Sequence, residues 1–276
     1  MADIFADADE AFCGRFGLTL PVQHVSAETM AAVLAALPVP YACSSGGNAA
    51  NTAKIAAGLG LKAAFFGCVG GEKGPRTEAA PAFAGEADCF GKFFEKELSK
   101  AGVFPALRPG NQPTGIFLCL TVNGEKRIAA SPSAALELRA EDLPDPESIR
   151  RRSKPGAFLF EGFLLENNAV KKRCLEIAES SGLVTAFDPG TVAGTYAGEI
   201  ISWLTKYNLV LFVNEDEAEA LAGGIYGGSG RDADWKPLFA RLTGKSGTVA
   251  VKLAEKGAAV FSGGGFYRAE TRLVKT

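Results

Sequence analysis

The sequence predicts an α/β protein whose main sheet is largely parallel and is covered by helices on both faces. The chain has 276 residues, 47% hydrophobic and 22% charged, which is a globular composition long enough for one large domain. Continuous apolar runs, typical of strands buried on both faces, alternate along it with helical patterns. Such alternation predicts a parallel sheet between helix layers, with ligands bound at the carboxyl ends of the strands.

Apolar runs bounded by glycine or polar residues predict the strands of this sheet, over 63–70, 157–165, 183–188, 209–214 and 248–254. Helical patterns fall at about 48–58, 88–101, 167–181, 195–206, 215–222 and 234–243. Residues 71–87 are polar and turn-rich, which predicts a loop of unassigned role.

A second set of short strands, which no crossover helices follow, predicts a small antiparallel sheet. These stretches are 18–26, 39–45, 114–122 and 126–131, within two segments of about 12–45 and 112–131. The pair Asn123-Gly124 between the last two is a strong hairpin signal. A lid over a substrate and a surface hairpin without that role both fit the pattern.

Composition excludes several classes of function. The net charge of -2 gives no reason to expect nucleic acid or an anionic membrane as a partner, and no apolar run reaches the length of a membrane span. With His24 as its one histidine and no C-x-x-C pair among six cysteines, the chain has no zinc site of the usual spacing. The N-terminus has no secretory signal pattern, so we expect a reduced, cytoplasmic protein.

The most specific pattern begins at Gly46-Gly47, which leads into an Ala-rich helix with Asn51 near its start. Paired glycines let the backbone approach a ligand closely, and the N–H groups of a helix start bind polar ligands. A tight turn with close packing would produce the same pair.

The longer spacing resembles the first signature of the PfkB (ribokinase-like) family of carbohydrate and nucleoside kinases. The matching positions are Gly46, Gly47, Ala49, Asn51, Ala53, Gly60 and Gly70. The resemblance implies a ribokinase-like three-layer α/β/α fold with a mostly parallel central sheet and a small β lid, in a single domain over residues 1–276. It implies an ATP-dependent, Mg²⁺-using phosphotransferase that acts on the primary hydroxyl of a sugar or nucleoside, and it is compatible with a homodimer formed through the lid.

The resemblance also implies the substrate-binding residues. Gly46, Gly47 and Asn51 would form the floor of a polyol pocket, and Asp3 matches an aspartate that binds two substrate hydroxyls. The spacing from Asp3 to Gln23, and the hairpin region with Arg127 after its turn, are similar to the adenosine kinase-like subgroup, which implies that Gln23 and Arg127 also bind substrate.

Other segments leave the substrate open. The hairpin opening Gln112-Pro113-Thr114-Gly115 and the segment 160–164 look like the adenosine kinase-like subgroup. By contrast, 188–191 (Asp-Pro-Gly-Thr) is more similar to the sugar kinases.

Two further motifs would bind the nucleotide. Asn214 and Glu217 lie three apart after a strand, which fits an acidic first helical turn but also matches the family's N-x-x-E motif. That match implies that both bind ATP and that Glu217 holds the metal. Lys252 and Gly257 match the family's nucleotide-binding hairpin, where Ala254 replaces the usual glycine; an ordinary hairpin fits the same residues.

The family's second signature, D-T-x-G-A-G-D, supplies the anion hole and the general base, and residues 1–276 do not contain it. The resemblance therefore implies a chain incomplete at both ends: the base motif is expected beyond Thr276, and about one strand is expected before Asp3. A fragment, a decayed or wrongly bounded gene, and parts supplied from elsewhere would each explain this. We expect no catalytic residue and no kinase activity in 1–276.

Two other functions compete with the kinase. A non-catalytic sugar- or nucleoside-binding remnant would keep the substrate pocket without turnover. A nucleotide-cofactor oxidoreductase is disfavoured, because no G-x-G-x-x-G opens a helix after a strand.

Overall fold

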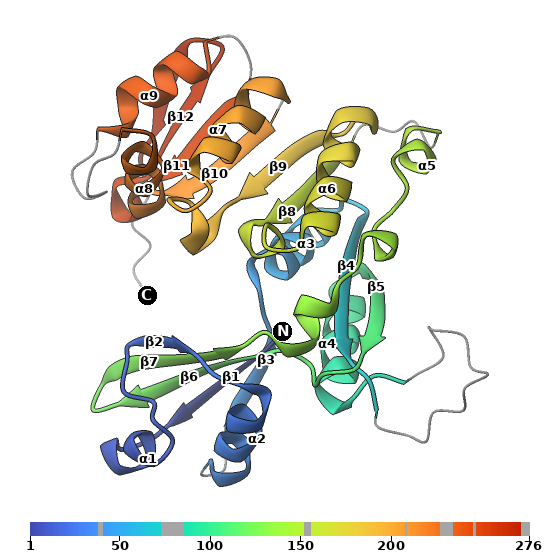
Figure 1. Ribbon diagram of the computed structural model, residues 1–276, viewed down its shortest axis with the longest axis vertical. Coiled ribbons are helices and arrows are strands. Elements are labelled where there is room, and N and C mark those ends of the chain that lie inside the picture. The colour runs from blue at the N-terminus through green and yellow to red at the C-terminus, as the bar shows by residue number, and fades with distance from the viewer. Residues whose placement is uncertain are drawn as a thin grey trace. The chain divides into compact units, whose positions relative to one another are not determined.

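The computed structural model describes residues 1–37, 41–72, 86–151, 156–207, 209–226, 234–244 and 247–271. It divides into two compact units, Met1–Asp142 and Leu143–Thr276, and both are built of helices and sheets (Figure 1). The α/β class is thereby confirmed. That the two units together form a single domain over 1–276 stays a prediction. None of the described helices is both long and apolar enough to cross a membrane.

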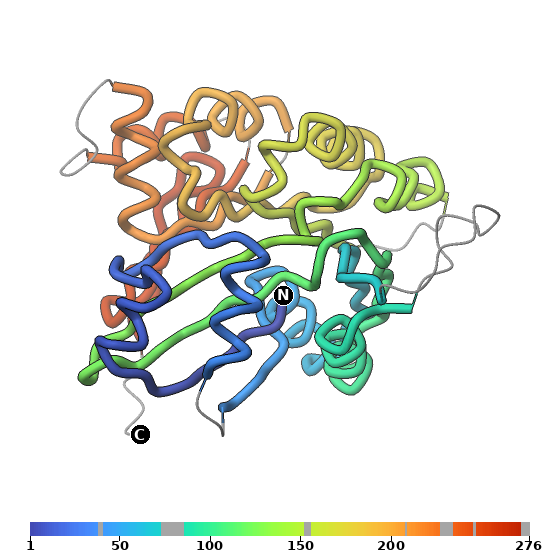
Figure 2. Tube along the Cα trace, turned by 60° about the horizontal axis from the view of Figure 1, so that its bottom comes forward, coloured from blue at the N-terminus to red at the C-terminus, as the bar shows by residue number. Residues whose placement is uncertain are grey.

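The first unit contains a five-stranded sheet in which the N-terminal strand lies beside the later hairpin (Figure 2). In spatial order the strands are β2 (Val22–His24), β7 (Glu125–Ser131), β6 (Ile116–Val122), β1 (Ala2–Asp7) and β3 (Ala42–Ser45). The hairpin β6–β7 forms as predicted, and both of its turn residues, Asn123 and Gly124, have positive φ, as a tight two-residue turn requires.

The prediction that this sheet is antiparallel is wrong. β1 runs parallel to β6, and β2 runs parallel to β7, while β1–β3 and β6–β7 are antiparallel. Parallel pairing needs long connections. The early strands are connected by two helices, α1 (Glu10–Arg15) and α2 (Ala27–Ala36), which the sequence pattern did not reveal.

One face of the five-stranded sheet is covered by α1 and α2. The core between them buries apolar side chains that include Ile4, Met30, Val33, Leu118 and Leu120. Because side chains alternate along a strand, Asp3 and Phe5 of β1 point to the opposite face, and Phe5 is 43% exposed there. The face that carries Ile4 therefore packs against the core, whereas Asp3 and Phe5 lie on the other face.

The rest of the first unit is a parallel pair, β4 (Ala63–Gly70) and β5 (Val103–Gly110), packed with α3 (Asn48–Gly58) and α4 (Cys89–Lys100). Val69, Phe94, Leu98 and Val103 fill the core between them. The limits of β4 and α3 were predicted correctly. Strand β5 was not, because Pro105 and Pro109 argue against a strand except at a sheet edge.

The predicted loop 71–87 is closed at its base. Gly71 and Ala87 form an antiparallel bridge, and Lys92 of α4 contacts the carboxylates of Glu72 and Glu86 at 2.7 and 2.8 Å. Residues 73–85 of this loop lie outside the described residues.

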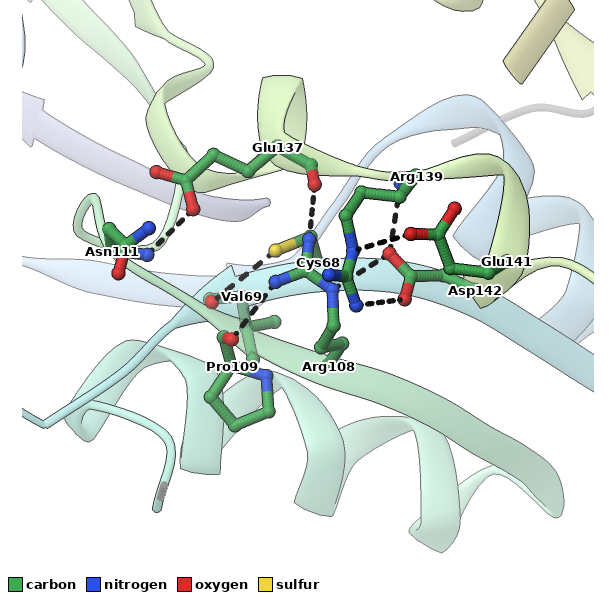
Figure 3. Close-up of polar contacts among 9 residues, drawn as sticks. All are labelled: Cys68, Val69, Arg108, Pro109, Asn111, Glu137, Arg139, Glu141 and Asp142. Carbon is green, nitrogen blue, oxygen red and sulfur yellow. Dashed lines mark hydrogen bonds and ion pairs between the residues drawn. The ribbon is translucent and has the colours of Figure 1, made fainter. Parts of the chain in front are cut away.

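A buried charge cluster fixes the segment that leaves the hairpin against β5 (Figure 3). The carboxylate of Asp142, 4% exposed, accepts a 2.7 Å bond from Arg108 Nε and a 3.2 Å bond from Arg139. Burial alone would raise the pKa of Asp142, but these hydrogen bonds outweigh it and hold the pKa below the ordinary value of 3.8. Glu137 accepts the backbone N–H groups of Asn111 and Gln112, which fixes the turn after β5.

The second unit is a six-stranded sheet with the order β13-β12-β11-β10-β9-β8. Its strands are β8 (Ala157–Glu161), β9 (Val184–Asp188), β10 (Leu209–Asn214), β11 (Thr248–Lys252), β12 (Ala258–Ser262) and β13 (Gly265–Ala269). Its longer helices are α6 (Asn168–Ser180), α7 (Ala197–Lys206), α8 (Glu215–Tyr226) and α9 (Trp235–Leu242). Strands β8 to β11 are mutually parallel, as predicted, and β12 and β13 continue the sheet as antiparallel strands. The prediction that 63–70 belongs to the same sheet is wrong, because β4 pairs with β5 in a separate two-stranded sheet.

Candidate functional site

The first group of predicted residues meets where β1 and β3 pair. Asp3 lies opposite Ser44 across the antiparallel ladder, so its side chain passes over Gly46, which follows β3. The approach is so close that a Cβ on Gly46 would lie 1.8 Å from Asp3 Oδ2 and 1.9 Å from Oδ1. A side chain on residue 46 would therefore displace the Asp3 carboxylate, which is a steric reason for glycine at this position.

Both carboxylate oxygens of Asp3 remain able to accept hydrogen bonds from a ligand. Within the described residues it accepts no hydrogen bond. Burial raises the pKa of Asp3 above 3.8, while the charges of the N-terminus and of Lys54 act in the opposite direction. Lys54 itself is anchored, because its Nζ donates to the carbonyl and hydroxyl oxygens of Ser45 at 2.7 and 3.0 Å. An acceptor with two free oxygens beside a fixed cation can bind neighbouring hydroxyl groups.

Gly47 begins the helix that carries Asn51. Its φ of 97° is in the region that favours glycine, and it is the N-cap of α3 without a side-chain cap bond. The first-turn N–H groups of α3 are therefore left to solvent or a ligand. Asn51 donates its backbone N–H to the Gly47 carbonyl and exposes its side chain one turn into the helix.

Gln23 and Arg127 lie elsewhere on this sheet. In register, Gln23 pairs with Ala129 and Arg127 with Leu120, both of which face the α1 and α2 core, on the side opposite to Asp3. Gln23 bonds to Gly17 and Leu20 around a turn, and Arg127 bonds to Leu18 and Glu10. These partners give both side chains a structural role, and the structure does not bring them to Asp3.

The second group of predicted residues lies at the carboxyl ends of the parallel strands in the second unit. Asn214 and Glu217 form a reciprocal capping box at the start of α8: Asn214 N–H donates to Glu217 Oε2, and Glu217 N–H donates to Asn214 Oδ1, both at 2.8 Å. The N-x-x-E spacing is thus the spacing that caps a helix. One carboxylate oxygen of Glu217 has no bond in this pair.

Polar residues end each parallel strand at this edge. They are Glu161 of β8, Asp188 of β9, Asn214 of β10 and Lys252 of β11. Lys252 Nζ lies 3.4 Å from Asp188 Oδ2. Burial raises the pKa of Glu217. The nearby negative charge of Asp188 raises this pKa further, and the positive charge of Lys252 lowers it. The charges of Asp188, Glu217 and Lys252 therefore interact with one another.

Gly257 closes the hairpin between β11 and β12. Its φ is 91°, and a Cβ there would lie 2.0 Å from the Ala269 carbonyl oxygen, so only glycine fits. Lys252 and Ala258 pair directly across this hairpin, which places Gly257 beside the strand end that carries Lys252. Ala254, in the same turn, also adopts a positive φ of 48°.

Sequence reasoning missed two residues of these groups. Lys54 lies within a helix whose pattern gives no hint that its side chain returns to Ser45. Asp188 was noted only as part of a sugar kinase-like stretch, and its contact with Lys252 depends on the order of the strands. No cluster of three or more His, Cys, Asp or Glu side chains that could hold a metal occurs among the described residues.

The chain is similar to known kinases in sequence and in fold. The sequence model of the pfkB family carbohydrate kinases matches residues 82–276, and no curated protein matches the chain. Adenosine kinase from Sinorhizobium meliloti is 23% identical with a TM-score of 0.76, over 100% of this chain and 79% of that one. A probable sugar kinase from Rhizobium etli is 23% identical with a TM-score of 0.76, over 99% and 77%.

A third solved structure shares the fold. Adenosine kinase from Anopheles gambiae, in complex with P1,P4-di(adenosine-5) tetraphosphate, is 18% identical with a TM-score of 0.73, over 99% of this chain and 85% of that one. At these identities the structures establish a shared ribokinase-like fold, and the family match over more than half of the chain establishes descent. The chain belongs to the PfkB family of carbohydrate kinases.

Proposed function

We propose that this chain carries the substrate and nucleotide pockets of an ATP-dependent phosphotransferase that acts on the primary hydroxyl of a sugar or nucleoside. The observation that carries the proposal is the contact between Asp3 and Gly46, because a Cβ on residue 46 would collide with the Asp3 carboxylate, so that glycine lets this carboxylate keep its position. Asp3 would accept two neighbouring hydroxyls of the substrate. Gly47 and Asn51 would supply polar groups at the start of α3.

The nucleotide would bind at the strand ends of the second unit. Lys252 would contact phosphate oxygens, Gly257 would let the hairpin approach the nucleotide, and Asn214 would hold Glu217 in position through the capping box. Magnesium prefers oxygen donors and keeps several waters, so a pair of carboxylates suits it. Glu217, influenced by the charge of Asp188, fits that donor set and would hold the ion. The ion would neutralise the phosphates during transfer.

Residues 1–276 contain no D-T-x-G-A-G-D motif, and we propose that this polypeptide binds its ligands without transferring phosphate. In phosphoryl transfer the enzyme positions the groups, and a carboxylate base takes the proton of the attacking hydroxyl. The residues assigned above can position both ligands. None of them is assigned as the base.

Calorimetry with adenosine, ribose and fructose, with and without ATP and Mg²⁺, tests the pockets, and a phosphate-transfer assay on the same samples tests turnover. We expect saturable binding of one of these compounds without product, which would also favour the binding-remnant alternative for this polypeptide. Robust ATP-dependent phosphorylation by 1–276 would refute the absence of turnover. If no sugar or nucleoside binds, the assignment of Asp3 fails.

A further inference from the structure

A cleft of the second unit is lined by residues that have no assignment so far. This open cleft has a volume of about 390 Å³ and lies between the edge strand β13, the start of α9 and the β11–β12 turn. A ligand pocket in a protein typically has a volume of a few hundred Å³ or more, so the space suits a small molecule. A second hollow of about 310 Å³ adjoins it and shares Lys236 and Phe266.

The cleft opens on the opposite side of the sheet from Lys252. Across the ladder, Ala259 pairs with Arg268, and Phe261 pairs with Phe266. These residues point to the face that α9 covers, where Phe261 packs against Trp235. Lys252 pairs with Ala258, which alternates to the other face. A ligand in the cleft would therefore not occupy the place proposed for the phosphates of ATP.

One wall of the cleft is aromatic. Trp235 is buried, at 5% exposed, and makes an edge contact with Phe261 at 6.0 Å between ring centroids. Phe266, whose ring lies 5.0 Å from Phe261, is 55% exposed at the rim. A planar ring that packs on Phe266 would extend this cluster and would cover apolar surface that solvent now contacts.

The other wall is cationic. Lys236, Lys256 and Arg268 all line the cleft, against a single carboxylate, that of Glu215. Lys256 lies 3.7 Å from Glu215 and accounts for that charge. Within the described part of the chain, neither Lys236 nor Arg268 forms an ion pair with a carboxylate. Two cations near one another without a counter-charge attract an anion, and the arginine fork suits phosphate.

We propose that this cleft is a second ligand site, which binds a nucleoside monophosphate with its base on Phe266 and its phosphate at Arg268 and Lys236. Arg268 and Phe266 are two residues apart on β13 and so lie on the same face, which matches a ring and a phosphate on one ligand. The site shares Leu253 and Lys256 with the turn that precedes Gly257. A bound ligand would hold that turn in place from the side opposite to Lys252.

Calorimetric titration of the whole 1–276 chain with AMP tests the site, with inorganic phosphate as the ring-free probe. We expect saturable AMP binding that is weakened about tenfold by Arg268→Gln, since that change removes a charge-assisted contact. Phe266→Ser should weaken AMP but leave any phosphate binding unchanged. Lys236→Gln provides an independent variant on α9. Lys172→Gln, at an 80% exposed lysine of α6, is the matched charge control and should have no effect.

Variants of the assigned pockets separate this proposal from the proposed function. Asp3→Asn and Lys252→Gln should leave the AMP affinity unchanged if AMP binds in the cleft. If either of them abolishes AMP binding while Arg268→Gln does not, AMP occupies an assigned pocket and the second site is refuted. Absence of AMP binding, or equal affinity for AMP and inorganic phosphate, would also overturn it, and neither result bears on sugar or nucleoside binding at Asp3.

Discussion

The carboxylate of Asp3 lies directly over the Cα of Gly46, where an added Cβ would come within 1.8 Å of Oδ2. The two residues belong to neighbouring segments that β1–β3 pairing brings together, since Ala2 pairs with Ser45 and Asp3 with Ser44. Lys54 secures the same loop from α3 through two bonds to Ser45. The glycine and the carboxylate are therefore one structural feature.

Gly46→Ala should displace the Asp3 carboxylate. The clash is with a side chain whose strand is paired on both sides, so we expect a loss of about 1–3 kcal/mol in the free energy of unfolding, typical of overpacking. Any sugar or nucleoside that binds wild type should bind the variant at least about tenfold more weakly, because a charged hydrogen-bond acceptor moves. Urea unfolding and calorimetry measure the two effects.

Gly58→Ala is the matched control for this substitution. Gly58 is the last residue of α3, and no atom outside its own helix and chain neighbours lies within 4 Å of the position of an added Cβ. Alanine is preferred to glycine in helices, so stability should be unchanged or should rise by up to about 1 kcal/mol. Equal losses in the two variants would show that Gly46 has no special contact with Asp3.

Asp3→Asn should stabilise the protein at neutral pH while it weakens ligand binding. Burial raises the pKa of Asp3 in the folded state above its ordinary value of 3.8, so the folded chain holds this proton more tightly than the unfolded chain does. Its contribution to stability therefore falls as pH rises from 3.8 through the folded pKa, and the ionised carboxylate is destabilising at about pH 7. Asparagine removes that charge.

Thermal unfolding at several pH values tests this sign. The melting temperature of Asp3→Asn should exceed that of wild type at about pH 7, and the difference should shrink towards about pH 3, where Asp3 is protonated. Lys54→Met should act in the opposite direction at neutral pH, because it removes the charge that favours the ionised form. A lower melting temperature for Asp3→Asn at neutral pH would contradict the burial argument.

Asn214 and Glu217 allow the structural and metal-binding roles of the N-x-x-E motif to be separated. Asn214→Ala removes an N-cap acceptor and should cost about 1 kcal/mol of stability. Glu217→Gln keeps an oxygen that can accept the Asn214 N–H, so stability should change little, whereas the Mg²⁺ dependence of nucleotide affinity should be lost. If Glu217→Gln keeps that Mg²⁺ dependence, Glu217 is a capping residue and not a metal ligand.

Local patterns predicted much of this fold. The runs that became β4 and β10, the helix α3 and the turn Asn123-Gly124 have limits that glycine, capping and apolar periodicity define without help from the rest of the chain. Strand β5 could not be predicted in the same way. Its prolines are tolerated only because it lies at the edge of a two-stranded sheet, which is a property of the tertiary structure.

The candidate site was predictable where one short segment defines it. Gly46, Gly47 and Asn51 lie within one loop and helix start, so their spacing was informative. Gln23 and Arg127 depend instead on strand register, and a shift of one residue moves a side chain to the other face of a sheet. The sequence contained no signal for the parallel insertion of β1 beside β6, and that pairing decides which face Asp3 shares.

Ala254→Gly should stabilise the turn between Lys252 and Gly257. Ala254 has a φ of 48°, a left-handed conformation that costs an alanine about 1–2 kcal/mol and glycine almost nothing. The side chain is exposed, so little packing is lost, and the hydrogen bond that the Thr271 hydroxyl donates to the Ala254 carbonyl can remain. Glycine also has the larger chain entropy in the unfolded state, which offsets part of this effect. We therefore expect the free energy of unfolding, measured with urea, to rise by about 0.5–1 kcal/mol.

The same change at Ala32, an exposed position in α2 with ordinary helical geometry, should instead cost about 1 kcal/mol. A loss of stability in both variants would mean that the strain at Ala254 is not present in solution.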